Sequence, residues 1–139
     1  MRLLALALFV GCATASGPDV NVQLEQVTTF ADLRYAGPVN VEFRVTVTND
    51  TDAPVTLTRI ELRTAGPGAY TLREPAIPLN LPVPARMSAA VTVTARGMST
   101  GGHSNSTEPV TVRATAYLNG PGGATTRMIN ATFGQSRRE

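Results

Sequence analysis

VNVEFRVTVTN, residues 39–49, is the stretch of sequence that decides the fold. Apolar side chains occupy every second position from Val39 and include Phe43, and polar side chains occupy the positions between them. An alternation of period two over this length is typical of a β-strand with one face in a core and the other in water. The stretch contains no Gly or Pro. We therefore predict that it forms the central strand of a sheet.

Further segments of the same kind lie on both sides of this stretch, and turns rich in Gly, Pro, Asn and Asp separate them. The alternation changes phase at Thr58-Arg59, which predicts a β-bulge. Four prolines between residues 75 and 84 place the segment that begins at Tyr70 at a sheet edge, because proline cannot donate a ladder hydrogen bond. The other strands are expected at 20–24, 55–64, 70–77, 86–95, 109–118 and 129–133.

No segment shows a convincing helical period. Seven short strands joined by turns predict an all-β fold, a seven-stranded antiparallel Greek-key sandwich. From 20 to 133 the spacing of the strands resembles that of an immunoglobulin-like or fibronectin-III-like domain. The Cys pair and core Trp of antibody domains are absent from the sequence. Another Greek-key sandwich or a small barrel is the alternative fold.

Composition limits the possible functions of the chain. The 139 residues suffice for one domain, and 42% of them are hydrophobic. The net charge is +2, and all twelve basic residues are Arg, scattered singly along the body of the chain. This pattern gives no basic patch, so we expect no nucleic-acid partner. A single Cys excludes an internal disulfide.

The N-terminus reads MRLLALALFVGCATASGPD and has the order of an export signal, with Arg2, an apolar run and then small residues. As a helix, the apolar run 3–10 would span only about 12 Å, too short for a ~30 Å hydrocarbon core. FVGC, residues 9–12, resembles the bacterial lipobox, which implies lipid attachment at Cys12. We therefore expect a signal with lipobox and short linker at 1–19, a β-sandwich at 20–134 and a frayed tail at 135–139.

Simple secretion is the alternative to lipid attachment. Ala13-Thr14-Ala15 fits the small-x-small rule for cleavage before Ser16, and Cys12 would then be lost with the signal. In the first case the protein is anchored by acyl chains in the cell envelope, with the outer membrane or its periplasmic face expected. In the second case it is soluble and secreted.

Few residues point to catalysis or metal binding. His103 is the only histidine, and no G-x-S-x-G motif accompanies it, so we expect no enzyme and no catalytic residue. Asp50 and Asp52, beside Asn49, could offer oxygen ligands to calcium, but a turn that uses these side chains for its own backbone explains the same residues. We expect neither a metal site nor a cofactor.

A binding site, if the domain has one, is expected at one end of the sandwich. Alternate loops of a Greek key meet at the same end, which would bring the loops around 34–35, 66–69 and 96–108 together. The candidate residues in these loops are Arg34, Tyr35, Arg96 and His103, since Tyr and Arg are enriched at binding hot spots. Tyr35, Tyr70 and Tyr117 are the candidates for exposed aromatic side chains.

The sequence thus predicts a scaffold more sharply than a function. We expect an exported bacterial module without catalysis that is tethered to the membrane by an N-terminal lipid. It would serve as an interaction or structural module of the cell envelope that binds or supports another envelope protein. A secreted or tethered module that binds a glycan or a peptide is the alternative.

Overall fold

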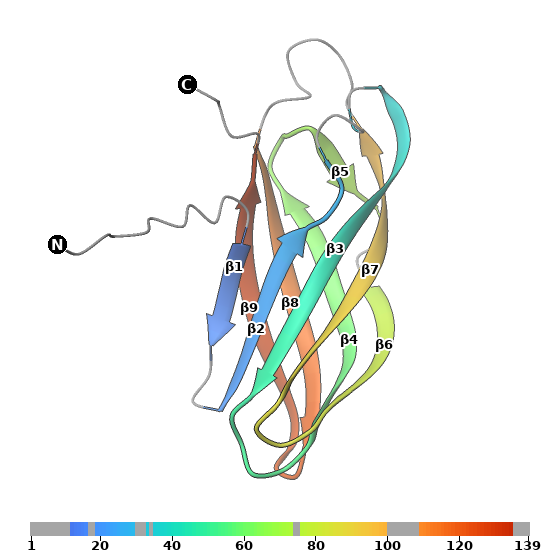
Figure 1. Ribbon diagram of the computed structural model, residues 1–139. Coiled ribbons are helices and arrows are strands. Elements are labelled where there is room, and N and C mark those ends of the chain that lie inside the picture. The colour runs from blue at the N-terminus through green and yellow to red at the C-terminus, as the bar shows by residue number, and fades with distance from the viewer. Residues whose placement is uncertain are drawn as a thin grey trace, which may run out of the picture.

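The computed structural model describes residues 12–16, 19–29, 33, 35–73, 76–99 and 109–134. Within these residues nine strands form two antiparallel sheets, in the orders β1-β2-β3-β7-β5 and β6-β4-β8-β9 (Figure 1). We call them sheet A and sheet B. The strands are β1 (Cys12–Ser16), β2 (Val20–Gln26), β3 (Gly37–Asn49), β4 (Val55–Ala65), β5 (Tyr70–Leu72), β6 (Ala76–Val83), β7 (Ser88–Ser99), β8 (Val110–Gly120) and β9 (Gly123–Phe133).

The prediction of an all-β protein with two antiparallel sheets is confirmed, but the strand count of seven was wrong. The segment expected as one strand at 70–77 is divided between the sheets, because β5 pairs with β7 and β6 pairs with β4. In addition, β1 pairs with β2, so the sheet begins before residue 20, where the domain was expected to start. Short edge strands are the part of such a fold that period-two patterns define least.

β3 is the long interior strand that the alternation predicts. It pairs with β2 along one side and with β7 along the other, from Gly37–Ser99 to Thr48–Ser88. Val41, Phe43, Val45 and Val47 are fully buried. The predicted bulge is also present, because the register of β4 shifts between Leu57 and Arg59 against both of its neighbours.

The core lies between the two sheets and is built from their inward-facing side chains. The rings of Phe43 in sheet A and Phe133 in sheet B lie 5.9 Å apart, tilted by 51°. Ile129 and Ala131 join Phe133 in the core, as the alternation of the last strand predicts. Met87 precedes β7, and 56% of it is exposed, so the inward alternation of this strand begins at Ala89.

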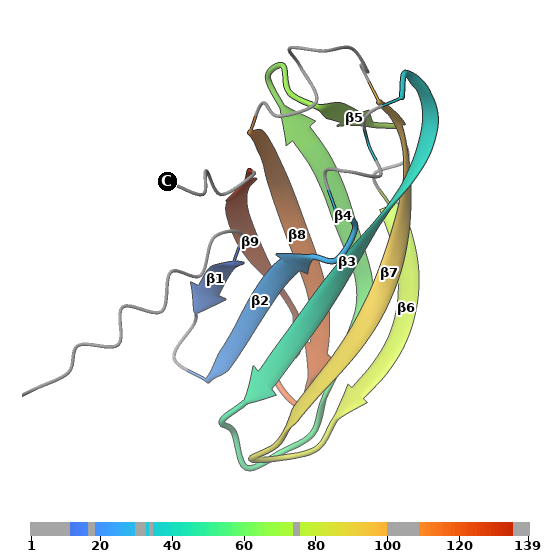
Figure 2. The same cartoon turned by 45° about the horizontal axis from the view of Figure 1, so that its top comes forward.

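The two flanks of the sandwich differ. On one flank β1 lies beside β9, and the Arg127 Nε donates to the carbonyl oxygen of Val20 at 3.4 Å. On the other flank the edge strand β6 lies beside β7 (Figure 2). β6 contains Pro78 and Pro82, as expected of an edge strand.

Candidate functional site

The candidate residues that the sequence predicts do not form one site among the described residues. Cys12 is the first residue of β1. Tyr35 is 73% exposed, and Arg96 is exposed near the end of β7. Arg34 and His103 lie outside the described residues. The structure therefore places Tyr35 and Arg96 on the surface and gives no geometry that joins the four loop candidates into one site.

The described parts of the loops that were expected to meet lie near one another, whereas Arg34 and residues 100–108 lie outside the described residues. The Ser99 hydroxyl donates to the carbonyl oxygen of Leu33 at 2.6 Å and lies 3.4 Å from that of Ala69. Leu33, in the loop between β2 and β3, is fully buried. A Cβ on Gly68 would lie 2.9 Å from the carbonyl oxygen of Pro109, so the β4–β5 loop is pressed against the start of β8. In the described part of the chain, the Ser99 hydroxyl and the close approach at Gly68 thus hold these segments against one another.

Tyr70 is a core residue, and the expectation that it is exposed was wrong. It is fully buried at the start of β5, and its hydroxyl donates to Gln26 Oε1 at 2.7 Å. Burial raises the pKa of the Tyr70 phenol far above its ordinary value, so the group stays protonated as a donor. The residue joins the short β5 to the end of β2.

The side chain of Asn49 stabilises the acidic turn after β3 by hydrogen bonds to the backbone. Its Nδ2 donates to the carbonyl oxygens of Ala53 at 2.8 Å and Val83 at 3.1 Å, and its Oδ1 accepts from the backbone N–H of Thr51. The Asp52 carboxylate accepts from Arg86 at 2.8 Å. Among the described residues no group of three His, Cys, Asp or Glu side chains could hold a metal ion.

The outer edge of β7 is the first surface that suits a partner. β5 covers only Gly97–Ser99, and the Arg73 N–H donates to the Arg96 carbonyl. From Ser88 to Ala95, within the described residues, β7 pairs with β3 alone. We call this segment the open edge. Antiparallel strands use the backbone groups on both sides, so alternate N–H and C=O groups of the open edge face outward.

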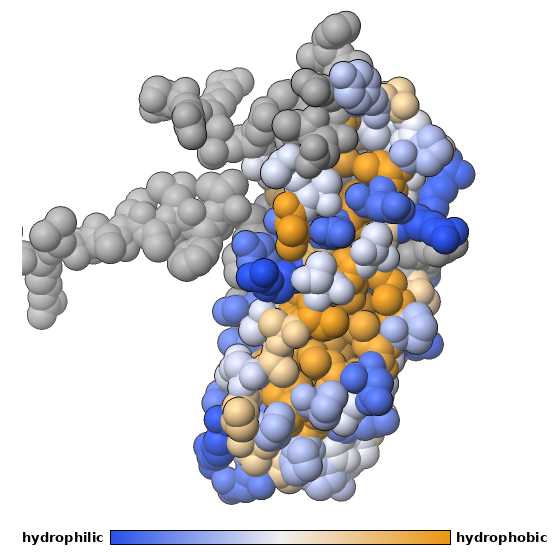
Figure 3. All heavy atoms as spheres, turned by 45° about the vertical axis from the view of Figure 1, so that its right-hand side comes forward, coloured by the Kyte–Doolittle hydropathy of each residue, from blue (hydrophilic) through white to orange (hydrophobic). Residues whose placement is uncertain are grey.

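Half-buried apolar side chains run alongside the open edge. They come from the inward positions of two strands in different sheets, and we call them the apolar stripe: Ile77, Leu79 and Leu81 of β6 with Ala89 and Val91 of β7. The space-filling view of this flank shows a continuous hydrophobic band along the molecule (Figure 3). A contiguous apolar band, unlike single exposed apolar residues, is typical of an interaction surface.

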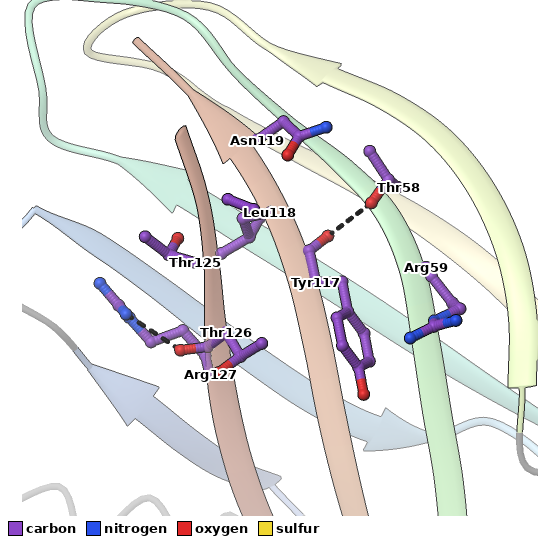
Figure 4. A pocket seen from close by; sticks show the side chains of 9 residues that line it. Thr58, Arg59, Tyr117, Leu118, Asn119, Thr125, Thr126 and Arg127 are labelled. Atoms are coloured by element: carbon purple, nitrogen blue, oxygen red, sulfur yellow. Dashed lines mark hydrogen bonds between the residues drawn. The ribbon is translucent and has the colours of Figure 1, made fainter. Parts of the chain in front are cut away.

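The outer face of β4, β8 and β9 is the second such surface. It contains an open hollow of about 840 Å³ near the turn that joins β8 to β9. The Arg59 guanidinium lies 4.0 Å from the centre of the Tyr117 ring, and the two side chains point toward each other in Figure 4. The bulge at Thr58 sets this arrangement, because it turns Arg59 outward, directly opposite Tyr117.

Sequence reasoning missed this face and the open edge. The outward parity of Tyr117 was visible in the sequence, but its neighbours depend on the register of β4 and β9 against β8. That register places Glu61, Thr115 and Met128 in one row and Arg63, Arg113 and Asn130 in the next. The outward positions of all three strands, read together, are the signal that could have found it.

No helix in the described part of the chain has the length and apolar character needed to cross a membrane. No protein-family model and no curated protein matches the sequence.

Several solved structures resemble the chain, among them two with a TM-score of 0.51. One is the Northeast Structural Genomics Consortium target SoR45, with 10% identity over 87% of this chain and 90% of that chain, at a TM-score of 0.51. The other is the GAE domain of yeast GGA1, with 13% identity over 88% of this chain and 97% of that chain, also at 0.51. β2, β3 and β7 of sheet A correspond in space and in chain order to the A, B and E strands of an immunoglobulin domain, and β4, β8 and β9 of sheet B to the C, F and G strands. The edge strands β1, β5 and β6 are placed around this framework. The strand order and these likenesses support an immunoglobulin-like β-sandwich.

Proposed function

We propose that the protein is a non-catalytic interaction module of the cell envelope that binds an extended segment of another envelope protein at the open edge of β7. The observation that carries the proposal is the pairing of β7, which is complete toward β3 and stops at Gly97 on its other side among the described residues. An extended segment that adds to the sheet is the ligand that satisfies such a row of backbone groups.

The composition of the open edge supports the same function. Ser88–Ala95 reads SAAVTVTA and contains no charge, no Pro and no Gly. Proteins normally protect a free edge with charged residues, prolines or bulges, and no register shift interrupts the pairing of β7 with β3. An unprotected edge rich in β-branched residues favours pairing with another strand.

The apolar stripe defines the chemistry of the ligand. In an added strand every second side chain would face the gap between the sheets, beside Leu79 and Val91. The ligand is therefore an uncharged segment of about six to eight residues with apolar side chains at alternate positions.

Attachment to the membrane through a lipid on Cys12 is the second element of the proposal. The pairing of β1 with β2 supports it over cleavage after Ala15. Processing before Cys12 keeps all of β1, whereas cleavage after Ala15 leaves only Ser16 of that strand. The intact mass of the mature protein decides between the two: an acylated N-terminal Cys12 is expected, and an N-terminal Ser16 would contradict the anchor.

Photo-crosslinking from the open edge tests the binding function. A photoreactive phenylalanine analogue at the exposed Thr92 of the full chain, expressed in its host, is expected to crosslink to a segment of the predicted pattern. The matched position is Thr46 on the neighbouring β3, where no such crosslink is expected.

A charge on the apolar stripe provides the control for specificity. Val91→Lys is expected to lower the crosslink yield about tenfold while the domain stays folded, since an inward-pointing lysine at an edge blocks strand pairing. A crosslink between two copies of this chain, or a yield that Val91→Lys leaves unchanged, would contradict the proposal.

A further inference from the structure

The outer face of sheet B carries an excess of positive charge in the described part of the chain. Among the described residues, Glu61 is the only acidic side chain on this face, against three arginines: Arg59, Arg63 and Arg113. The outer face of sheet A carries equal numbers of both signs: Glu25, Glu42, Arg44 and Arg96. The net charge of +2 is thus unevenly distributed over the fold.

Two of the arginines on sheet B repel each other. Arg63 on β4 and Arg113 on β8 are directly opposite in the register, and both are exposed. Like charges in this position destabilise a sheet. Arg113 Nε donates to Asn130 Oδ1 at 3.3 Å, and within the described residues neither guanidinium forms an ion pair. An anion that bridges the two arginines would remove the repulsion.

The third arginine, Arg59, lies four residues before Arg63 on β4 and contacts two neighbouring side chains. The Arg59 guanidinium lies over the Tyr117 ring and 3.6 Å from the Glu61 carboxylate. Arg59 and Arg63 are separated by about 13 Å along β4, from four residues at ~3.4 Å each. The face therefore offers an uncompensated pair of cations at Arg63 and Arg113, and a second guanidinium at Arg59 whose charge Glu61 partly offsets, to a ligand that extends along the strands.

The surroundings of the arginines are rich in hydroxyl and amide groups. Thr115 and Asn119 of β8 and Thr126 and Asn130 of β9 lie on this face, beside the hollow or in the rows above it. Among the described residues of this face, Met128 alone is a strongly exposed large apolar side chain, at 62%. The buried core of a protein interface is mostly apolar, whereas the outward side chains of these three strands are mainly hydroxyl, amide and charged groups. Hydroxyl groups and carboxylates match this face better, because arginine binds a carboxylate with two parallel hydrogen bonds.

We infer that the outer face of β4, β8 and β9 binds an acidic polysaccharide, with carboxylates at Arg63–Arg113 and at Arg59 and sugar hydroxyls on the threonines and asparagines. This surface is on the opposite side of the sandwich from sheet A and does not include the open edge of β7. The inference is therefore independent of the proposed function.

Calorimetric titration of the full chain tests it with polygalacturonate as the probe. Dextran serves as the neutral polymer and polyglutamate as the acidic peptide. The double variant Arg63→Gln/Arg113→Gln is expected to bind polygalacturonate at least about tenfold more weakly, from the loss of charge-assisted hydrogen bonds. Arg44→Gln, on the outer face of sheet A, is the matched control and is expected to change affinity by less than about twofold.

Thermal unfolding separates a binding defect from a folding defect. The double variant is expected to unfold at the same or a higher temperature, because it removes the repulsion between opposed arginines. Val91→Lys is expected to bind polygalacturonate normally. Equal binding of dextran, binding of polyglutamate as tight as that of polygalacturonate, or an equal effect of Arg44→Gln would each overturn the inference.

Discussion

β3 and β7 lie side by side in sheet A and share the same alternation, yet they differ in what surrounds them. β3 has a strand on each side and carries Glu42 and Arg44 on its outer face. β7 carries no charge between Ser88 and Ala95, and in the described part of the chain no strand pairs with its other side there. The interior strand is thus built for stability. We take the edge strand, with its outward backbone groups and adjoining apolar stripe, to be built for association.

The largest effect is expected where the interior strand meets the core. Val45→Asp places an unpaired charge at a fully buried position, at a cost of several kcal/mol, comparable to a domain's whole stability of ~5–15 kcal/mol. The variant is therefore expected to be unfolded by circular dichroism. Thr46→Asp, on the outer face of the same strand, should change the unfolding free energy by less than about 1 kcal/mol. A folded Val45→Asp protein would contradict the conclusion that β3 is the central strand of the core.

The end of β3 should show the next largest effect. Asn49→Ala leaves the buried carbonyl oxygen of Val83 without its donor and frees the turn that follows the strand. A loss of about 2–4 kcal/mol is expected in chemical denaturation. Asp50→Ala, at the exposed neighbouring position, is the control and should stay within about 0.5 kcal/mol of the wild type.

A smaller effect is expected where β5 covers the upper part of β7. Tyr70→Phe removes the hydroxyl that donates to Gln26 Oε1, which should cost about 1–2 kcal/mol. The backbone amide hydrogens of Thr71 and Leu72 should also exchange with solvent faster, because the variant binds β5 less firmly to β2. Tyr117→Phe keeps its ring under Arg59 and should leave both measurements unchanged; an equal loss there would mean that the Tyr70 hydrogen bond is not the cause.

The smallest change in stability is expected at the edge that proline protects. Pro78→Thr/Pro82→Thr in a Val91→Lys background gives β6 backbone donors while β7 stays blocked. The unfolding free energy should change by less than about 1 kcal/mol, but self-association in sedimentation experiments should increase about tenfold. If the variant stays monomeric at every concentration where the parent does, proline is not what keeps β6 unpaired.

Local patterns in the sequence predict much of this fold. The alternation of β3, the inward set of β9 and the bulge at Thr58 are confirmed, because each depends on a few consecutive residues. Tyr70 was assigned to the surface because its burial depends on Gln26 and on the position of a three-residue strand. The division of 70–77 between two sheets likewise depends on which distant strand each half meets.

The candidate sites were less accessible from the sequence. Arg63 and Arg113 look like isolated charges until the register of β4 and β8 places them opposite each other. The apolar stripe combines residues of β6 with residues of β7, and no single strand contains its pattern. The loop candidates were chosen by residue type alone, and of these the structure describes Tyr35 and Arg96 on the surface.

The position of β1 has a consequence for the orientation of the molecule on a bilayer. On the proposed anchoring, the acylated residue is the first residue of an edge strand, so that no flexible tether separates the lipid from the sandwich. Sheet A would then rest with its β1 side toward the lipid headgroups. β7 lies three strands away, about 14 Å further from the bilayer at ~4.8 Å per strand. The unpaired side of β7 would face the aqueous compartment, where a strand from a soluble or membrane-spanning neighbour can approach it without displacing lipid.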